Sequence, residues 1–448
     1  MSTETVESDT ARSEDFVPRF RRIFPGSLLA AVLLSLVTLA ATIGRLEPVR
    51  QLELFSTGFF ELFRIQMALV LWWLLSAVAV ESPAVGAAFD RLAGAVPTSQ
   101  RWIVGTTAFA ALGLGWVNWA LGLIGGLLLG RKLCGRAAAE GVPVDYPAVL
   151  TGGLLAVVLA NQGPTSPGGL LMASEDLAYL GESAGTVALG AFVAHPANLL
   201  ASAVLAVTLP VVLVALAPAE GDRRTLDPQG EVRSIRERLG HYDVPPAGDF
   251  VPADRLEQSR GLTALIAVIG GASVLWSWTT GTPVAMLSVL FALVVVGMAL
   301  QERPMAFVGK TADATRWVLH LAIPFLFYGG IVALLGESGL YDPIGTLLAV
   351  ESATPVGPFL GALGLGLLVP DPGSVWVLLG PGLFGTGLPL VPTLAAVMFG
   401  AGLSNLWLGF LFVGLLPIPG CDWRAFVRYA GVVTVHAAVV VLGTFALV

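Results

Sequence analysis

The stretch Trp102–Gly130, WIVGTTAFAALGLGWVNWALGLIGGLLLG, contains 29 residues and no charged side chain. As one helix it would be about 43 Å long at ~1.5 Å per residue, too long for one upright crossing of a ~30 Å hydrocarbon core and too short for two. Arg101 precedes it and Arg131 follows it, so the excess of basic residues on cytoplasmic loops places both flanks inside the cell. We therefore predict a re-entrant hairpin that enters from the cytoplasmic side.

The composition indicates the same environment for the rest of the chain. Hydrophobic residues make up 55% of the sequence and charged residues 12%, whereas soluble domains carry roughly 25% charged residues. Apolar runs of about twenty residues recur from Ser27 onward, each long enough to cross a bilayer. Cys134 and Cys421 lie in no metal-binding spacing, so a disulfide framework or zinc site is not expected. These observations predict an all-α polytopic membrane protein in the cytoplasmic membrane, with the lipid bilayer as its main partner.

Hydrophobic runs and basic residues together give one topology. A second long uncharged run, Val356–Leu388, has acidic but no basic flanks, so we predict a hairpin entering from outside. Nine full spans are expected near residues 27–43, 60–80, 146–170, 188–217, 261–279, 283–300, 317–336, 389–418 and 425–447. This layout puts the N-terminus in the cytoplasm and the C-terminus outside, with all basic residues except Arg45, Arg50 and Arg64 on the cytoplasmic side. Pro304–Trp317 reads as an amphipathic helix on the inner surface.

The order of spans and hairpins suggests an inverted repeat. We expect a cytoplasmic tail (1–26), a first membrane repeat (27–217), a cytoplasmic linker with seven arginines (218–260) and a second repeat with one extra connecting span (261–448). Each half has a Gly-rich or Pro-rich stretch that predicts a broken helix, one at Asn161 and one at Asn405. Inverted repeats with paired broken helices are typical of secondary transporters, whose substrates bind near the bilayer midplane. The alternative is that such stretches only ease helix packing.

Several stretches, in this order and spacing, resemble the bacterial and archaeal short-chain fatty acid transporter family from about residue 20 onward. They are Gly58–Leu69, Val117–Trp119, Asp145–Pro147, Arg255–Arg260, Phe325–Gly330, Glu337–Leu340, Val369–Pro370 with Trp376, and Trp423–Tyr429. The resemblance implies uptake of acetoacetate, butyrate and related monocarboxylates by an ion-coupled transporter with paired hairpins and an elevator motion. It also leaves a homodimer open.

The chain departs from the family pattern at three places. At the second hairpin tip Asp371 is added, and Val375 stands where the family usually has histidine. Before Asn405 the family tends to have Glu, Gln and Trp, which Ala401–Leu403 replace. In the second span the apolar run Trp73–Leu75 replaces a polar histidine.

Polar residues at the expected hairpin tips and breaks are the candidates for binding a small organic anion. An asparagine amide both donates and accepts hydrogen bonds, and a helix that starts after the first break would offer a positive N-terminal end. Each candidate could instead cap a helix or a turn. The predicted substrate-binding residues are Asn118, Asn161, Thr165, Ser166, Ser374 and Asn405.

Asp371 is the main candidate for ion coupling, because it is the only charged residue between Glu351 and Asp422. A carboxylate within the membrane is costly and by default marks a proton or cation site; the alternative is a turn cap in exterior water. Ser404 and Asn405 could supply oxygen ligands to Na⁺, or could bond between helices. No cofactor is expected beyond Na⁺ or H⁺ as the coupling ion.

Secondary active transport of a short monocarboxylate is therefore the leading hypothesis. A dicarboxylate or other small organic anion is the alternative substrate, and an uncoupled channel or sensor the alternative activity. An intramembrane enzyme is disfavoured, because there is no HExxH motif, no aspartate-rich pair and no second membrane aspartate beside Asp371. Nothing in the sequence points to nucleic acid as a partner.

Overall fold

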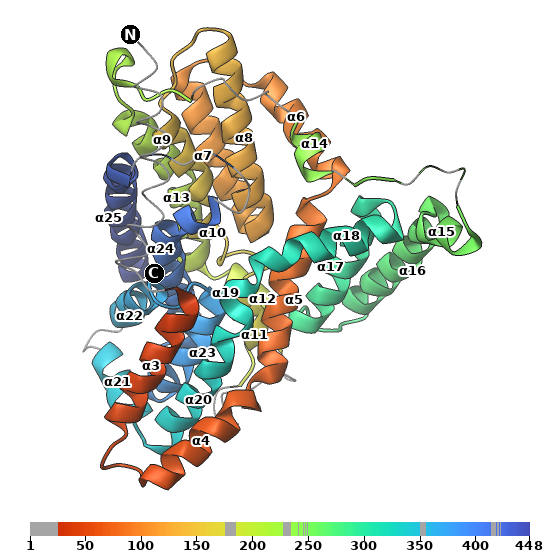
Figure 1. The fold of residues 1–448 in the computed structure, drawn as a ribbon. Coiled ribbons are helices and arrows are strands. Elements are labelled where there is room, and N and C mark those ends of the chain that lie inside the picture. Colours follow the sequence, from red (N-terminus) through yellow and green to blue (C-terminus); the bar gives the residue numbers. More distant parts are fainter. Residues whose placement is uncertain are drawn as a thin grey trace.

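The computed structural model describes residues 26–174, 185–226, 234–240, 242–244, 246, 248, 250–349, 355–413, 418, 421 and 423–448. Within these residues the named elements are all helical, as predicted (Figure 1). Six described helices are long and apolar enough to cross a membrane, or seven if one bent pair counts as a span. They are Phe63–Val80, Pro196–Leu216, Arg260–Thr279, Leu319–Glu337, Leu390–Gly409 and Arg424–Leu447. The polytopic class is thus supported, while the nine spans and the inverted repeat stay predictions.

The first helices pack as a group with a helix from the second half of the chain. Helices α3 (Ser27–Ala41) and α4 (Pro48–Glu61) both contact α20 (Pro324–Glu337). A Cβ atom added at Gly58 of α4 would lie 2.8 Å from the carbonyl oxygen of Gly329 in α20, so only glycine permits this backbone approach. Helix α5 (Phe63–Val80) follows and runs into the centre of the molecule (Figure 1).

The run Trp102–Gly130 folds into two helices that double back on each other, as predicted. Helices α7 (Gln100–Val117) and α8 (Trp119–Ala139) meet at Asn118, whose backbone is extended. A Cβ atom added at Gly126 would lie 2.8 Å from the Cβ of Ala111, so the two helices run antiparallel at close range. Both helices extend past the uncharged run, so the hairpin is longer than its apolar core.

The predicted break at Asn161 is confirmed. Helices α9 (Tyr146–Leu154) and α10 (Ala156–Leu159) end before it, and α11 (Pro167–Met172) begins after it. The non-helical segment 160–166 contains the two residue types that end helices most readily, glycine and proline. A Cβ atom added at Gly163 would overlap the backbone carbonyl oxygen of Trp116, near the end of α7. The break therefore lies directly against the first hairpin tip.

The second long run is also divided in two, but the second predicted break is wrong. Helices α22 (Val356–Gly366) and α23 (Pro372–Leu383) meet at residues 367–371, whereas α24 (Leu390–Val413) continues through Asn405. The stretch before Asn405 has no proline, and glycine within a helix costs only about 1 kcal/mol. A Cβ atom added at Gly400 would lie 3.0 Å from the backbone nitrogen of Leu363. The glycines there bring α22 close to α24 rather than opening the helix.

Some of the remaining helices form an arm. In Figure 1 the arm of α15, α16 and α17 projects away from α24 and α25. The axis bends by 116° between α17 and the segment Pro304–Trp317, which is helical as predicted. The α-helices not yet described are α6 (Pro83–Ala95), α12 (Leu189–Val193), α13 (Pro196–Leu216), α14 (Ile235–Leu239), α15 (Pro252–Glu257), α16 (Arg260–Thr279), α17 (Met286–Gln301), α18 (Pro304–Ala314), α19 (Leu319–Ala322), α21 (Tyr341–Leu348) and α25 (Trp423–Leu447).

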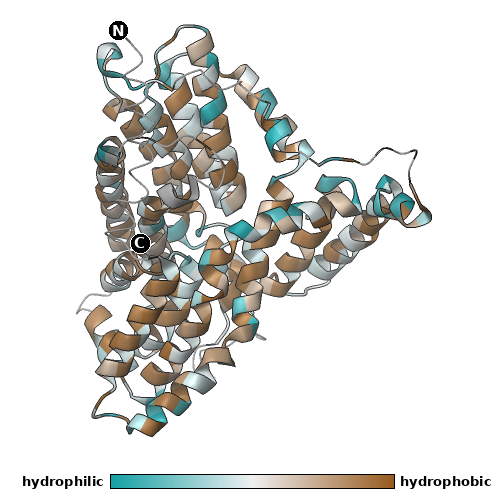
Figure 2. Ribbon diagram, in the orientation of Figure 1, coloured by the Kyte–Doolittle hydropathy of each residue, from teal (hydrophilic) through white to brown (hydrophobic). Residues whose placement is uncertain are grey.

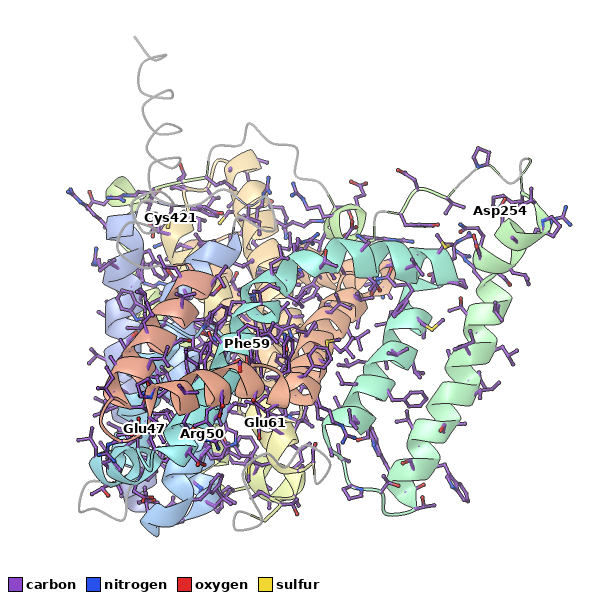
Figure 3. All side chains as sticks on the ribbon, turned by 60° about the horizontal axis from the view of Figure 1, so that its bottom comes forward. Glu47, Arg50, Phe59, Glu61, Asp254 and Cys421 are labelled. Atoms are coloured by element: carbon purple, nitrogen blue, oxygen red, sulfur yellow. The ribbon has the colours of Figure 1, made fainter. Side chains whose placement is uncertain are left out.

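Polar residues gather at the ends of the molecule. Figure 2 shows hydrophilic colours on the short linker helices α14 and α15 and hydrophobic colours along the long helices. Figure 3 shows Cys421 and Asp254 at one edge, with Glu47 and Arg50 lying away from it. We call the edge with Cys421 and Asp254 the linker face. This distribution is what a bilayer requires of a multi-pass protein.

Asp90 of α6 holds the linker helix α14 in place. Its carboxylate accepts hydrogen bonds from Lys132, from the Ser234 hydroxyl, and from the backbone N–H groups of Ile235 and Arg236 at 3.0 and 3.1 Å. Burial alone would raise the pKa of Asp90, but these donors outweigh it and lower the pKa to about 2. The anchoring carboxylate is therefore ionised at every physiological pH.

We expect Asp90→Asn to release α14 from α6, because an amide cannot replace an ionised acceptor of four donors. Loss of about 1.4 kcal/mol of anchoring should make tryptic cleavage after Arg236 and Arg238 roughly tenfold faster. Asp342→Asn, which removes an exposed carboxylate from α21, is the control. In the unchanged protein the anchoring should be complete above the ordinary pKa of 3.8 and fade as the pH falls toward about 2. Because trypsin is inactive at that pH, amide hydrogen exchange in α14 is the measurement for this part. Equal cleavage rates in all three proteins would contradict this account.

Gly163→Ala should destabilise the protein, because its methyl group would meet the Trp116 carbonyl, which belongs to the backbone and cannot rotate away. Overpacking of this kind costs about 1–3 kcal/mol. The measurement is the melting temperature of the purified protein in detergent. Gly113→Ala in α7, where a Cβ atom meets nothing within 4 Å, should leave the melting temperature unchanged or raise it. A Gly163→Ala protein as stable as this control would show that the break is not held against the tip.

Candidate functional site

Helix α5 joins the two hairpin tips. The indole N–H of Trp73 donates to Oδ1 of Asp371 at 2.8 Å, and the Ser76 hydroxyl accepts from Nδ2 of Asn118 at 3.0 Å. Residues three apart lie on the same face of a helix. One face of α5 therefore meets the first tip at Asn118 and the second tip at Asp371.

Asp371 caps α23 and is completely buried. Its Oδ2 accepts from the backbone N–H of Ser374 at 2.6 Å and from the Ser374 hydroxyl at 2.7 Å. The exposed fraction of Asp371 is 0%, so the turn cap that the sequence allowed is formed, but away from solvent. The hydrogen-bond partners of Asp371 in the described part of the chain are neutral donors. The carboxylate thus has hydrogen bonds but no counter-ion there.

The break in the first half contacts both tips. The Thr165 hydroxyl donates to the carbonyl oxygen of Val117 at 2.9 Å, one residue before Asn118. On the other side, a Cβ atom added at Gly373 would lie 3.2 Å from the Cβ of Pro167. The predicted residues Asn118, Thr165, Ser374 and Asp371 therefore gather around α5 and the break.

Two of the predicted substrate-binding residues, Asn118 and Ser166, cap helices. The Asn118 carbonyl Oδ1 accepts from the backbone N–H groups of Ala120 and Leu121 at 3.0 and 3.4 Å, which caps α8. The Ser166 hydroxyl accepts from Gly169 N–H at 3.2 Å and caps α11. Because α11 has only six residues, its dipole offers an anion little beyond those N–H groups. Substrate contact by Ser166 stays a prediction.

The other three predicted residues, Asn161, Ser404 and Asn405, lie on α24 or against it. A Cβ atom added at Gly402 would lie 3.3 Å from Nδ2 of Asn161. The Ser404 hydroxyl donates to the carbonyl oxygen of Leu363 at 2.7 Å, a bond between α24 and α22. Oδ1 of Asn405 is buried and accepts no hydrogen bond among the described residues. These residues belong to α24 or contact it, and no hydrogen bond within the described ranges links them to Asp371.

Four tryptophans surround the contact between α5 and the tips, and sequence reasoning missed them. The ring of Trp73 lies 4.0 Å from that of Trp119 and 5.7 Å from that of Trp72, and Trp317 lies 5.6 Å from Trp119. Nε1 of Trp72 and of Trp119 is buried and donates to nothing in the described chain. Tryptophan normally concentrates at membrane interfaces, so an adjacent pair deep in a span was the available signal.

Neutral oxygen and nitrogen atoms dominate what this site offers a ligand. The described residues contain no group of three or more His, Cys, Asp or Glu side chains that could hold a metal ion. A hard monovalent cation would have to use hydroxyl, amide and backbone oxygens beside the one carboxylate, ligands that hard cations do accept.

Two solved structures, one described as a transporter and one as an efflux pump, share this fold. The chain matches the YdaH transporter of Alcanivorax borkumensis with a TM-score of 0.56 and 15% identity, over 94% of this chain and 97% of that one. It matches MtrF of Neisseria gonorrhoeae, from a class of antimetabolite efflux pumps, with a TM-score of 0.52 and 14% identity, over 94% and 95%. At these identities the match concerns the fold alone.

Sequence relatives are more specific. The chain is 25% identical over 431 residues to an Escherichia coli (strain K12) protein, covering 93% of this chain and 95% of the relative. It is 24% identical over 432 residues to a Haemophilus influenzae protein, covering 91% and 94%. Both are provisionally named short-chain fatty acid transporters. The family model described as "Short chain fatty acid transporter" matches residues 11–448. Because this model covers nearly the whole sequence, the chain belongs to the short-chain fatty acid transporter family, whose members are transporters and not enzymes.

Proposed function

We propose that this protein carries a short-chain fatty acid or a similar small monocarboxylate across the cytoplasmic membrane, coupled to Na⁺ or H⁺ through Asp371. The observation that carries the proposal is the meeting of both hairpin tips with one face of α5, where Asp371 bonds to Trp73 and Asn118 to Ser76. Such a meeting of discontinuous helices is where transporters of this architecture bind their substrates.

Charge is the argument for coupling. Asp371 is buried and has only neutral hydrogen-bond donors around it in the described chain. A carboxylate substrate beside it would put two negative charges in a medium of low dielectric, where their repulsion is strong. A proton on one carboxyl, or a cation between them, removes that repulsion. Binding of the anion would then favour binding of H⁺ or Na⁺, and the reverse, because the positive charge removes the repulsion between the two carboxylates.

Hydrogen-bond donors and aromatic rings argue for a short monocarboxylate. The indole N–H groups of Trp72 and Trp119 are buried without an acceptor, and a carboxylate accepts hydrogen bonds at both oxygens. The same rings present apolar faces to a short alkyl chain. A dicarboxylate would need a second set of donors, and no basic side chain in the described chain hydrogen-bonds to Asp371 or Asn118.

The packing of the helices supports an elevator motion. Helices α7–α11 and α22–α24 form one set: α10 crosses α24, and α11 touches both α23 and α24. Helices α3–α5 and α16–α20 form the other, with α5 packed on α17 and α4 on α20. The two sets meet where α5 faces the tips and where α20 packs on α23, so displacement of one set along these contacts would carry the tips and their ligand together. In each half, the first helix of the hairpin packs on the helix that follows the hairpin: α7 on α9, and α22 on α24. This correspondence between the halves also favours the inverted repeat.

Uptake into proteoliposomes tests the transport proposal. We expect saturable uptake of labelled butyrate and acetoacetate that depends on an imposed Na⁺ or H⁺ gradient, with succinate as the dicarboxylate comparison. Flux that rises linearly with concentration and ignores both gradients would indicate a channel. No uptake of either monocarboxylate under any gradient would remove this substrate class.

Asp371→Asn tests the coupling role. Because the amide keeps the size of the side chain and removes its charge, we expect uptake to persist in part while its dependence on the ion gradient is lost. Trp73→Phe removes one donor to the carboxylate, which at about 1.5–3 kcal/mol should shift the apparent ion affinity by roughly 10–100-fold. The control is Asp342→Asn, an exposed carboxyl on α21. Full gradient dependence in Asp371→Asn would exclude this residue from coupling.

A further inference from the structure

A basic pocket lies at the linker face, apart from the hairpin tips. It has a volume of about 610 Å³ and lies between the start of α9, the linker and the start of α25. The charged and polar residues that line it are Asp145, Asp222, Arg224, Arg424, Arg428 and Tyr429. Three arginines from two distant parts of the chain thus border one cavity. Figure 3 shows Cys421, just before α25, at this edge of the molecule.

Asp145 is engaged in holding the pocket together. Its carboxylate accepts from the Tyr429 hydroxyl at 2.7 Å and from the backbone N–H groups of Ala148 and Arg224, both at 3.1 Å. It is only 2% exposed. Asp145 therefore joins α9, the linker and α25. Asp222 is the other acid that lines the cavity.

The positions of the arginines favour an anion in the pocket. Arg424 and Arg428 lie in the first turns of α25 (Trp423–Leu447), where the positive end of the helix dipole disfavours cations. Three guanidinium groups around one cavity also repel one another. A phosphate group offsets both the unfavourable helix dipole and the repulsion between the arginines. Guanidinium binds phosphate through two parallel hydrogen bonds. Each guanidinium has five N–H donors, so contacts made within the chain leave donors for a ligand.

The surface of α25 beyond the pocket indicates that the anion is a lipid. Val432, Val435 and Val439 are 40%, 65% and 66% exposed, and they follow Arg428 at intervals of four, three and four residues. That spacing places them on the same face as Arg428. A stripe of exposed valines inside an apolar span faces the hydrocarbon, so a headgroup at the arginines would have its acyl chains along this stripe.

We propose that this pocket binds the phosphate headgroup of an anionic phospholipid, whose acyl chains lie on the valine stripe of α25. Basic pockets beside transmembrane helices are suited to such headgroups. The bound lipid bridges the linker, the first half of the chain at α9 and the second half at α25. The proposal concerns a site away from α5 and does not depend on which substrate is transported.

The test compares lipids on the full-length protein in a neutral detergent. Dioctanoyl phosphatidylglycerol should raise the melting temperature in a saturable manner, and dioctanoyl phosphatidylcholine should do so much less. In Arg424→Gln/Arg428→Gln the affinity for the anionic lipid should fall roughly thirtyfold, at about 1 kcal/mol per arginine. Arg255→Gln, which removes an exposed arginine from α15, is the matched control and should bind like the unchanged protein. Equal effects of both lipids, or unchanged affinity in the double variant, would overturn the proposal.

Two further measurements separate a lipid from soluble phosphate and guard against a misfolded variant. Val435→Asn keeps all three arginines and should weaken binding of the anionic lipid while leaving any effect of inorganic phosphate unchanged. Native mass spectrometry should show the lipid retained by the unchanged protein and by Arg255→Gln. If inorganic phosphate saturates the pocket and the acyl chains add no affinity, the ligand is a soluble anion and the lipid assignment is wrong.

Discussion

A helix that ends inside a membrane protein leaves backbone N–H and C=O groups that lipid cannot satisfy, and each such group costs several kcal/mol. In this chain the helix ends near the centre satisfy one another or are capped by short polar side chains. Asn118 caps α8, Ser166 caps α11 and Asp371 caps α23. The Thr165 hydroxyl pairs with the carbonyl oxygen of Val117 at the end of α7. The need to close these ends holds the tips and the break together, and so builds the site.

The same constraint explains why the polar residues serve two purposes. A side chain that caps a helix end within the membrane already lies where a ligand must bind, because the open backbone is there. Capping and ligand contact are therefore not exclusive at Asn118 or Asp371. A ligand that enters could replace the bonds to Ser76 and Trp73 without exposing the helix ends, since the capping bonds use other atoms of the same side chains.

Two departures from the family pattern prove to be one structural feature. Asp371 is added at the second tip, and Trp73 stands within the apolar run that replaces a histidine, yet the two side chains form a hydrogen bond at 2.8 Å. An added buried carboxylate needs a donor, and the indole N–H supplies one without adding charge. The polar contact between α5 and the second tip is thus made by Trp73 and Asp371. Sequence reasoning treated the two positions separately, because 298 residues separate them in the chain.

The sequence by itself determined the helical membrane class, the division of both long uncharged runs and the break at Asn161, because length, charge and proline act locally. It also identified the family, through the order and spacing of short stretches along the chain. It could not decide whether α24 is broken at Asn405, because glycine is compatible both with a break and with a close helix contact. Only the approach of α22 to α24 distinguishes the two. Nor could it find Trp73 and Ser76, whose role depends on which side of α5 meets the tips. Tertiary structure alone brought those atoms within hydrogen-bond distance, since residues remote in the chain become partners only through packing.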